Sequence, residues 1–593
     1  MSTATTSPIL APPGGSFLLE SRVPAEVFTP EDLTEEQRQI AATAARFARE
    51  EILPQLAVLE SKEHGAMESV LRKAAELGFT AVDIPEQYGG MGMDKITSTV
   101  VADHVSVLAS FSTAFGAHTG IGTLPLVWYG TEEQKQRYLP KLATSEWIAA
   151  YGLSEASSGS DAMNIRTRAV LSPDGAHYIL NGEKHWITNA GTASLYTVFA
   201  KIDGEKFSAF LVERGTPGLS VGAEEHKLGI RGSSTCPLIF SDCTIPKENL
   251  LGEAGKGHHI AFNVLNVGRL KLGVACIGGA RHALAHMIRY AKERQAFGRP
   301  IAERGLIQKK IALSAARLYA AESMAYRTAG MIDTRIAGIP DADVPRTMGE
   351  YAVECSILKV YGSEMLSFVA DELLATMGGY GYVEEYPAER LYRDARINRI
   401  FEGTNEINRL IITGWLMKQA MAGKLQLLAA IRRIMDEVTQ PPPFDSGSGS
   451  DEPLAREAAA LATVRKIALF AAGVASQRYM MALEEQQEIM ADLADIISQI
   501  YALESSLLRA QKIAGVNRSS AQVAAGMTSL IAEETMALAE MAARRVLAAC
   551  GDGDALHTQL AILRRLARFT PADSTALGRA VARHCIELER YPM

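Results

Sequence analysis

The sequence predicts a mainly α-helical protein with a β domain inserted between helical regions and a second helical domain at the end. Apolar residues recur at three- and four-residue spacing over 34–148 and again after residue 257, which is the period of amphipathic helices. Residues 149–257 instead show the two-residue alternation of strands. The stretch "TQPPPFDSGSGSDEP" (439–453) is rich in Pro, Gly and Ser, so it is predicted to be a linker before the last helical domain.

We divide the chain into six parts on these patterns. The opening "MSTATTSPILAPPGGSF" has no Lys or Arg before Arg22 and no continuous apolar run, so we expect a loose leader, not a secretory signal or transit peptide. Four long helical segments near 264–293, 306–336, 346–377 and 406–421 predict an antiparallel bundle. The predicted parts are a leader (1–33), an N-terminal helical domain (34–148), a central β domain (149–257), a helical bundle (258–422), an amphipathic segment and linker (423–453) and a C-terminal helical domain (454–593).

Within the β domain, three stretches predict particular strands. Asn181-Gly182 in "AHYILNGEKHWIT" is a strong signal for a hairpin turn. "LYTVFAKIDGEKFSAFLVERG" predicts a second hairpin, and "TCPLIFSDCTIP" predicts a strand that ends at its proline.

Composition excludes several classes of function for this chain of 593 residues. The net charge is -8, so no basic face is implied and nucleic-acid binding has no support. The six cysteines include no C-x-x-C pair, and no histidines have metal-ligand spacing, so we expect reduced thiols and no metal site. The run "IALFAAGVA" (467–475) is far short of the roughly 20 residues of a membrane-spanning helix. We therefore expect a cytoplasmic protein.

The glycine-rich stretches do not match nucleotide-binding motifs. "GEAGKGHH" (252–259) lacks the spacing of a phosphate loop, and "GGYGY" (378–382) does not lie in a βαβ unit, so nucleoside triphosphate and NAD binding are disfavoured. Gly116, Gly120 and Gly122 fall inside a helical pattern. They are expected either to open space beside the helix or to allow tight helix packing.

One carboxylate occupies an unusual place. In "RIFEGTNEINR" (399–409), Glu402 follows Ile400 and Phe401 directly, and a charge among apolar neighbours is costly unless it is paired or functional. Gly403, which follows it, suggests a close approach of another group to the backbone.

Three further motifs carry groups suited to binding. "YGLSEASSGSD" (151–161) offers hydroxyl groups and glycines in a loop. "NGEKHWITN" places Trp186 and Thr188 on one face of a strand, and "ERQAFGRPI" supplies Arg294 and Phe297 at helical spacing. Taken singly, a core tryptophan or a solvated arginine explains each as well.

In this order, these motifs and "GGYGYVEEYPAERLYRDARI" resemble the acyl-CoA dehydrogenase family, over nearly the whole chain. With its added C-terminal domain, the chain is most similar to the very-long-chain branch and to bacterial relatives with the same domain. The resemblance implies an FAD-dependent enzyme of fatty acid β-oxidation. It would introduce a trans double bond between C2 and C3 of a long acyl-CoA and pass electrons to an electron-transfer flavoprotein. It also implies a homodimer.

The resemblance implies roles for individual residues. Tyr151, Leu153 and Ser154 would contact the flavin, with Trp186 and Thr188 on its other edge. Gly159 and Ser160 belong to the loop near the cofactor pyrophosphate or the CoA, and Thr404 and Glu406 would hold the cofactor. Arg294, Phe297, Gln308 and Gly379 would reach the adenosine end of FAD across a subunit interface.

On the same resemblance, Glu402 is the catalytic base. Its backbone N–H would polarise the thioester carbonyl, while apolar surroundings should raise its pKa. Some relatives carry the base at the position that matches Gly268, where this chain has no side chain. Arg269 would lie near the CoA or the active-site loop. Gly403 would admit the thioester, and Gly116 and Gly120 would deepen the acyl pocket.

Three other functions remain open from sequence. An acyl-CoA oxidase would share the fold and the base but pass electrons to oxygen, whereas a flavin monooxygenase would not need Glu402. A scaffold protein would keep the fold without the chemistry. Separately, the amphipathic stretch "KLQLLAAIRRIMDEV" (424–438) is predicted either to pack on its own domain, which we favour, or to touch the inner face of a membrane.

Overall fold

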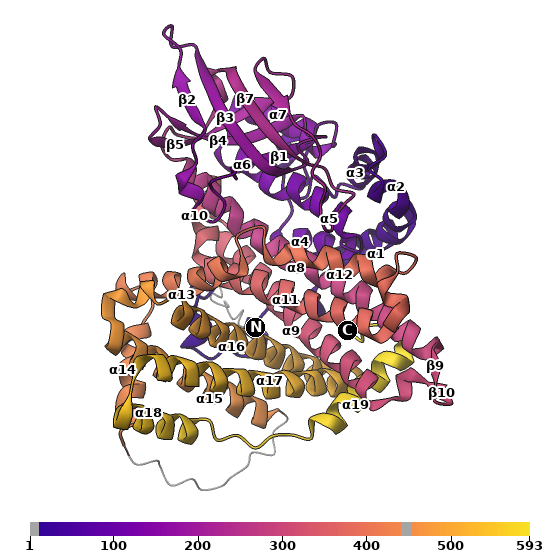
Figure 1. Ribbon diagram of the computed structural model, residues 1–593, viewed down its shortest axis with the longest axis vertical. Coiled ribbons are helices and arrows are strands. Elements are labelled where there is room, and N and C mark those ends of the chain that lie inside the picture. Colours follow the sequence, from indigo (N-terminus) through magenta and orange to yellow (C-terminus); the bar gives the residue numbers. More distant parts are fainter. Residues whose placement is uncertain (1–10, 441–453, 517) are drawn as a thin grey trace, which may run out of the picture.

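The computed structural model describes residues 11–440, 454–516 and 518–593. A β domain lies at one end of the molecule, a bundle of long helices forms the middle, and further long helices lie at the other end (Figure 1). The short N-terminal helices flank the bundle beside the β domain (Figure 1). This architecture confirms the predicted fold class. Most of the predicted linker, residues 441–453, lies outside the described residues.

The N-terminal domain consists of short helices with locally encoded starts. At the start of α1, Thr34 Oγ1 accepts a hydrogen bond from the Gln37 N–H at 3.2 Å, and Gln37 Oε1 accepts one from the Thr34 N–H at 3.1 Å, which is a capping box. The helices are α1 (Glu35–Phe47), α2 (Leu56–Glu60), α3 (Ala66–Glu76), α4 (Lys95–Val105), α5 (Ala109–Gly116), α6 (Leu124–Tyr129) and α7 (Glu132–Ala143), with a π-helical turn, η7 (Ala117–Gly122), between α5 and α6.

The central domain is built on one eight-stranded sheet. Its order is β6-β7-β3-β2-β4-β5-β8, and β1 pairs in parallel with β4. The strands are β1 (Ala149–Gly152), β2 (Arg168–Leu171), β3 (His177–Thr188), β4 (Leu195–Ile202), β5 (Lys206–Glu213), β6 (Leu219–Val221), β7 (Thr235–Pro246) and β8 (Leu250–Leu251). The predicted hairpin of β4 and β5 and the predicted strand β7 are both confirmed.

The hairpin predicted at Asn181-Gly182 is wrong. Strand β3 runs through both residues, and its register against β7 shifts between Leu180 and Gly182, so a β-bulge lies opposite Asn181, with the extra residue on β7. Gly182 has a φ of 141°, and a Cβ there would lie 2.7 Å from the Cα of Thr167. The glycine therefore serves a close backbone approach beside the bulge, which shares with a tight turn the need for a residue without a side chain.

The bundle confirms the four predicted long helices, although α8 begins earlier than predicted. A small hairpin of β9 (Gln295–Ala296) and β10 (Arg299–Pro300) follows α8, and a short helix precedes α11. Helices α8 and α11 approach closely at two glycines, because a Cβ at Gly362 would lie 3.1 Å from the Cα of Gly273. The helices are α8 (Gly257–Glu293), α9 (Gly305–Ile336), α10 (Val344–Met348), α11 (Ala352–Met377), α12 (Pro387–Ala395) and α13 (Asn405–Met421).

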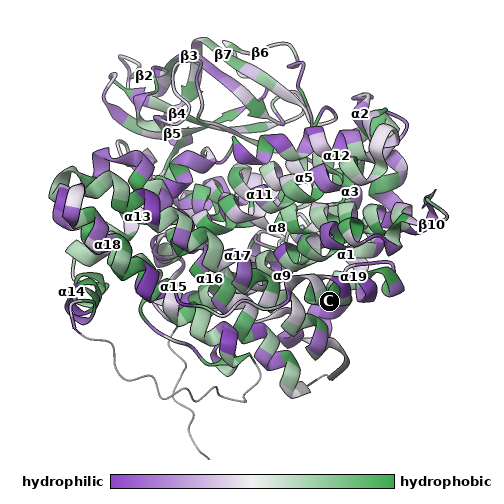
Figure 2. Ribbon diagram, turned by 60° about the horizontal axis from the view of Figure 1, so that its bottom comes forward, coloured by the Kyte–Doolittle hydropathy of each residue, from purple (hydrophilic) through white to green (hydrophobic). Residues whose placement is uncertain are grey.

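The last helices pack against the bundle through α9 and α13. Hydrophilic and hydrophobic residues alternate along α15, α16 and α17, as expected of helices that bury one face (Figure 2). The helices are α14 (Leu427–Glu437), α15 (Ala455–Tyr479), α16 (Gln487–Val516), α17 (Arg518–Cys550), α18 (Gly553–Leu566) and α19 (Ser574–Leu588).

Residues 11–33 of the predicted leader are not loose, so that expectation is wrong for this part. The N–H of Gly15 donates to Glu354 of α11 at 2.7 Å. The buried ring of Phe17 lies 4.7 Å from that of Tyr501 in α16, and Arg465 of α15 donates to the Phe17 carbonyl at 2.9 Å. This segment therefore connects the bundle with the C-terminal domain.

Two helices, α8 and α15, are long and apolar enough by length and composition to cross a membrane. Their most apolar stretches are 72% and 61% buried inside the protein, respectively. We therefore interpret both as core helices.

Candidate active site

Glu402 lies in a tight turn between η14 (Arg396–Arg399) and α13. Its φ is 58° and that of Gly403 is 81°, so two successive residues occupy the left-handed region. Such a conformation is unfavourable for a glutamate and is often found where function requires it. The Asn408 side chain donates to the carbonyl oxygens of Gly403 at 2.8 Å and Thr404 at 3.0 Å, so α13 holds the turn in place.

The carboxyl group of Glu402 is buried, although the residue as a whole is partly exposed. Burial raises the pKa of this carboxyl to about 7, and the positive charges of Arg269 and Lys359 only partly oppose the effect. Oε2 is buried and has no hydrogen-bond partner among the described residues. A carboxyl group with these properties is suited to accept a proton near neutral pH.

Gly268 provides the space that this carboxyl occupies. A Cβ at Gly268 would lie 2.6 Å from Glu402 Oε2, so a side chain there would displace the carboxyl. The two positions at which relatives are expected to carry the base thus face the same point. Next to Gly268, the buried Arg269 donates to Asn266 Oδ1 at 2.9 Å and, more weakly, to the Glu402 carbonyl at 3.4 Å. Arg269 therefore supports the backbone of the turn.

A cavity of about 90 Å³ adjoins the carboxyl, and we call it the acyl cavity. It follows one face of α8, because its lining residues on that helix recur at three- and four-residue spacing. Beyond Ala275, α4 closes on α8, since a Cβ at Gly278 would lie 2.1 Å from the carbonyl oxygen of Asp103. The residues that line the cavity are Ala102, Ser106, Ser112, Thr113, Phe115, Gly116, Ala117, Thr119, Ile121, Thr188, Gly268, Lys271, Leu272, Ala275, Asn398, Phe401 and Glu402.

The three glycines that the sequence left undecided have different roles. Gly116 lines the acyl cavity, and a Cβ there would meet open space. Gly122 serves tight packing, because its Cβ would lie 2.8 Å from Ala149 Cβ. Gly120 is not among the lining residues, and a Cβ there would contact Cδ of Lys271 at 3.6 Å.

Four polar side chains of the cavity wall, those of Ser106, Ser112, Thr119 and Lys271, form hydrogen bonds within the protein. The hydroxyl groups of Ser106 and Thr119 donate to backbone carbonyls four residues earlier, at 2.6 and 3.0 Å. The hydroxyl groups of Ser106 and Ser112 lie 3.0 Å apart, and Lys271 Nζ donates to Asp83 Oδ2 at 2.7 Å. Since these groups are already engaged, the wall favours a hydrocarbon chain over a polar one.

Trp186 and Thr188 lie at the end of β3, beside this cavity. Thr188 lines it, whereas the Trp186 side chain is 57% exposed and its φ is 57°. Ile187 between them is buried, so the two side chains share the other face of the strand. Tyr151 of β1 lies near Glu402. Burial raises the pKa of the Tyr151 hydroxyl, and the charge of the Glu402 carboxylate raises it further. An uncovered indole beside a buried carboxyl fits a planar aromatic cofactor such as a flavin.

The loop after β1 is anchored at Leu153 and open at its tip. Lys184 donates to the Leu153 carbonyl at 3.1 Å and to Glu155 Oε1 at 2.7 Å, a buried pair that the sequence did not reveal. Ser154 is half-buried, whereas Gly159 and Ser160 are exposed, with open space where a Cβ of Gly159 would lie. The open tip leaves room for a phosphate-bearing group.

The other predicted cofactor residues lie elsewhere on the chain. Arg294 and Gly379 line a hollow of about 520 Å³, where the Arg294 guanidinium lies 5.8 Å from the centre of the Tyr380 ring. Among the residues described as lining the two spaces, none is shared between this hollow and the acyl cavity. Nearby, Phe297 is 94% exposed, and Gln308 donates to a backbone carbonyl at 3.1 Å. A single chain therefore does not bring these residues to Glu402.

At the start of α13, Thr404 and Glu406 differ in their roles. Thr404 caps the helix by accepting a hydrogen bond from the Ile407 N–H at 3.2 Å. Glu406 is exposed on the first turn. Within the described ranges, no group of three or more His, Cys, Asp or Glu side chains could hold a metal ion.

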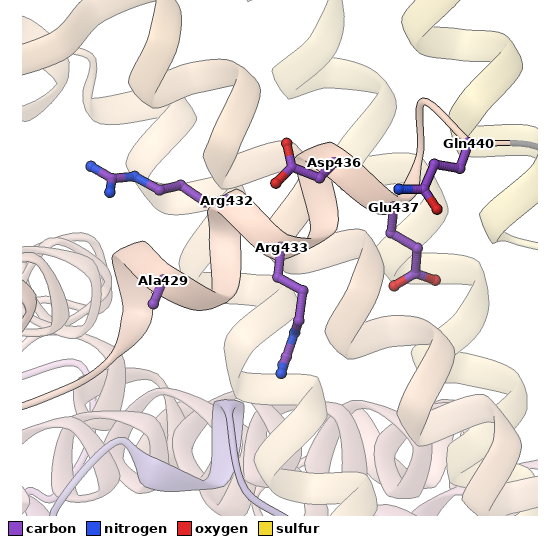
Figure 3. Close-up of a pocket in the computed structure, with 6 residues that line it drawn as sticks. All are labelled: Ala429, Arg432, Arg433, Asp436, Glu437 and Gln440. Atoms are coloured by element: carbon purple, nitrogen blue, oxygen red, sulfur yellow. The ribbon is translucent and has the colours of Figure 1, made fainter.

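A third hollow lies on α14, in the amphipathic segment, and it has no converging chemistry. The side chains of Arg432, Arg433, Asp436 and Glu437 point in different directions from the helix (Figure 3). On its other side, α14 packs on α15, where a Cβ at Gly473 would lie 2.8 Å from Met435 Sδ. The packing on its own domain that we favoured is therefore present.

Sequence reasoning missed two residues of the site. Lys271 lies one turn after Gly268 on α8, so helical periodicity could have placed it in the cavity wall. Asn408, which fixes the turn, lies six residues after Glu402, and no local pattern indicates its role.

Four family models match the chain. The acyl-CoA dehydrogenase N-terminal domain matches residues 34–146, the middle domain 150–243 and the C-terminal domain 255–417. A further model, also described as acyl-CoA dehydrogenase, C-terminal domain, matches residues 463–565.

Individual relatives agree with these matches. A "Probable acyl-CoA dehydrogenase" of Bacillus subtilis is 45% identical over 98% of both chains. The crystal structure of an acyl-CoA dehydrogenase complexed with FAD from Bacillus anthracis is 46% identical, with a TM-score of 0.96 over 98% of this chain and 100% of that one. The human very long-chain specific acyl-CoA dehydrogenase is 41% identical over 57% of this chain and 51% of its own.

The fold and these matches together define a flavin-dependent oxidoreductase. With matches over nearly its whole length, the chain belongs to the acyl-CoA dehydrogenase family. It is an acyl-CoA dehydrogenase, and its cofactor is FAD.

Proposed function

We propose that the protein dehydrogenates long-chain acyl-CoA thioesters to trans-2-enoyl-CoA in fatty acid β-oxidation, with Glu402 as the base. One observation carries this proposal: the Glu402 carboxyl is buried, its Oε2 has no hydrogen-bond partner among the described residues, and it borders a cavity in which Ser106, Thr119 and Lys271 are already hydrogen-bonded within the protein. Such a site offers a proton acceptor at the mouth of a space for a hydrocarbon chain.

In the proposed reaction, Glu402 removes a proton from C2 of the thioester. The turn that holds Glu402 presents its backbone N–H to the thioester carbonyl, so that negative charge developing on the oxygen is stabilised. Gly403 keeps the approach free of a side chain, and Arg269 and Asn408 keep the turn rigid. Bound FAD supplies the hydride acceptor for the hydrogen that leaves C3. Water is excluded by the acyl chain and by Phe401, which keeps Glu402 basic.

The preference for long chains rests on the added C-terminal domain and on the apolar character of the acyl cavity. Each buried methylene contributes about 0.8 kcal/mol, so activity should rise with chain length until the cavity is full. We expect anaerobic titration of the purified yellow protein with palmitoyl-CoA to bleach the flavin. A specificity constant that peaks at four to eight carbons would contradict the preference. No bleaching by any acyl-CoA would favour the scaffold alternative.

For the electron acceptor, we propose an electron-transfer flavoprotein. One similar solved structure, 37% identical over 65% of this chain, is described as "Electron transferring flavoprotein of Acidaminococcus fermentans: Towards a mechanism of flavin-based electron bifurcation". This description links a protein of the same fold to an electron-transfer flavoprotein and so supports the proposed acceptor. The palmitoyl-CoA-reduced protein should be reoxidised quickly by an electron-transfer flavoprotein and slowly by air. Stoichiometric peroxide at a comparable rate would instead identify an oxidase.

The raised pKa of Glu402 predicts the pH dependence of the reaction. Only the ionised carboxylate accepts a proton, so the rate of flavin reduction should rise with pH and level off above about 7, the pKa of this group. Stopped-flow reduction by palmitoyl-CoA from pH 5.5 to 9 would measure this. A rate that falls as pH rises through 7 would contradict the assignment.

We also propose a homodimer in which Arg294, Phe297, Gln308 and Gly379 serve the cofactor of the partner subunit. The exposure of Phe297 and the open space at Gly379 support this, as does the separation of their hollow from Glu402. Arg294→Ala should lower the amount of FAD retained after gel filtration, measured by visible absorbance per chain. Full FAD retention by a monomeric wild-type protein would contradict the proposal.

A further inference from the structure

A second, smaller cavity lies beside the acyl cavity, and we call it the side chamber. Its volume is about 10 Å³, which is close to the least that can hold one water molecule. Four residues line both spaces, which makes them the partition between the two: Ala102, Phe115, Thr119 and Lys271. The remaining side-chamber residues are Phe79, Thr80, Val82, Asp83, Ser98 and Val101.

Lys271 is the partition residue whose position depends on an ion pair. Its ammonium group donates to Asp83 Oδ2 at 2.7 Å and weakly to the Thr119 carbonyl at 3.4 Å. Its Cδ lies 3.6 Å from where a Cβ of Gly120 would be, so the aliphatic stem passes along the glycine face of η7. The charged end is thus held at the side chamber, and the stem forms wall between the two spaces.

Asp83 has enough other partners to remain satisfied if Lys271 is shortened. Its carboxylate is 4% exposed and also pairs with Lys95 of α4, while the Ser98 hydroxyl donates to Oδ2 at 2.8 Å. Lys95 does not line the acyl cavity. The chain therefore offers two lysines on one buried carboxylate, of which one forms cavity wall and the other does not.

We propose that Lys271 is a specificity-determining residue that closes the side chamber and so restricts the acyl cavity to straight acyl chains. This proposal rests on the proposed function of the cavity. Lys271 lies three residues after Gly268, about 4.5 Å further along the axis of α8. If C2 of the substrate lies beside Glu402 and Gly268, then C5 or C6 of an extended acyl chain lies beside the aliphatic stem of Lys271, at about one carbon per 1.3 Å. A methyl branch at that carbon meets the stem, whereas a branch further out passes it.

The wild-type protein provides the first test. We expect its kcat/KM to be about tenfold lower for 6-methylpalmitoyl-CoA than for palmitoyl-CoA, and nearly unchanged for 8-methylpalmitoyl-CoA, whose branch lies past the stem and before the closure beyond Ala275, as one methyl group in a shaped pocket allows. Equal values for all three substrates would overturn the proposal. Since this test needs no variant, it does not depend on the folding of one.

Three variants separate the effect of the aliphatic stem of Lys271 from the effect of its charge. Lys271→Ala opens the partition and should recover most of the rate with 6-methylpalmitoyl-CoA, relative to palmitoyl-CoA. Lys271→Met keeps a stem without the charge and should retain the discrimination. Lys95→Met is the matched control, because it removes the same charge from Asp83 without changing the cavity wall, and it should also retain the discrimination.

Other outcomes identify other roles. If Lys95→Met loses discrimination as Lys271→Ala does, the effect arises from the Asp83 charge cluster, and the proposal is wrong. If the wild type prefers an acyl-CoA with a terminal carboxylate over palmitoyl-CoA and Lys271→Met abolishes that preference, Lys271 binds an anion and the proposal is also wrong. Failure of every acyl-CoA to bleach the flavin would reject the proposed function itself, which is a distinguishable result.

Discussion

Replacement of Glu402 by Gln should leave FAD and acyl-CoA bound but slow reduction of the flavin by palmitoyl-CoA by about 10²- to 10⁴-fold, the usual contribution of a positioned base. The amide has nearly the same shape and cannot accept the proton. The charged groups that act on this carboxyl among the described residues, Arg269 and Lys359, are both cationic and do not replace it as a base. Stopped-flow absorbance of the anaerobic holoenzyme measures the effect.

A relocation variant provides the control for this prediction. Because a Cβ at Gly268 would lie 2.6 Å from Glu402 Oε2, a carboxylate on that position of α8 can reach the same point once Glu402 is removed. The double variant Gly268→Glu/Glu402→Gly should therefore recover part of the activity that Glu402→Gly alone loses. Rapid bleaching in Glu402→Gln would show that another group removes the proton.

The largest effect on stability is expected at Glu504 of α16. This carboxylate accepts hydrogen bonds from Arg327 of α9 at 2.9 Å and from Arg465 of α15 at 2.6 Å. The side chains of Arg327 and Glu504 are each 2% exposed. Glu504→Gln leaves a buried arginine without its counter-ion, a change that destabilises by about 3–5 kcal/mol. We expect a lower melting temperature of the holoenzyme and earlier proteolysis of the C-terminal domain.

The matched control for Glu504 is Glu540→Gln on α17. Glu540 pairs with Arg544 one helical turn away at 2.6 Å, and the side chains of Arg544 and Glu540 are 53% and 35% exposed. Exposed pairs of this kind contribute about 0.3–0.5 kcal/mol, so the melting temperature should hardly change. Equal shifts in the two variants would mean that burial of the Arg327 pair does not stabilise domain docking.

Much of the fold follows from local sequence patterns. Apolar residues at helical spacing over long stretches predict α8, α9, α11 and α13. The alternation of apolar and polar residues in "LYTVFAKIDGEKFSAFLVERG" predicts β4 and β5. The placement of Glu402 against apolar surroundings could also be predicted, because a carboxylate between Phe401 and Gly403 has few structural explanations. These features depend on residues close together in the sequence.

Features that depend on distant contacts could not be predicted. The Asn181-Gly182 pair satisfies a turn and a bulge equally well, and only the pairing of β3 with β7 decides between them. Likewise, the buried neighbours of Phe17 come from helices more than 400 residues away, so its segment looked unstructured in sequence. The partition at Lys271 depends on Asp83, a residue of another domain.

The contact of residues 11–33 with the last domain has a consequence for biosynthesis. Glu31 pairs with Arg509 at 2.9 Å, and Phe17 needs Tyr501. Arg509 and Tyr501 leave the ribosome only near the end of translation. Residues 11–33 therefore cannot take their final packing until after the middle domains have formed. A protein fused directly ahead of residue 11 would compete for that late docking step. A recombinant tag at the other terminus should therefore give the higher yield of folded, yellow protein.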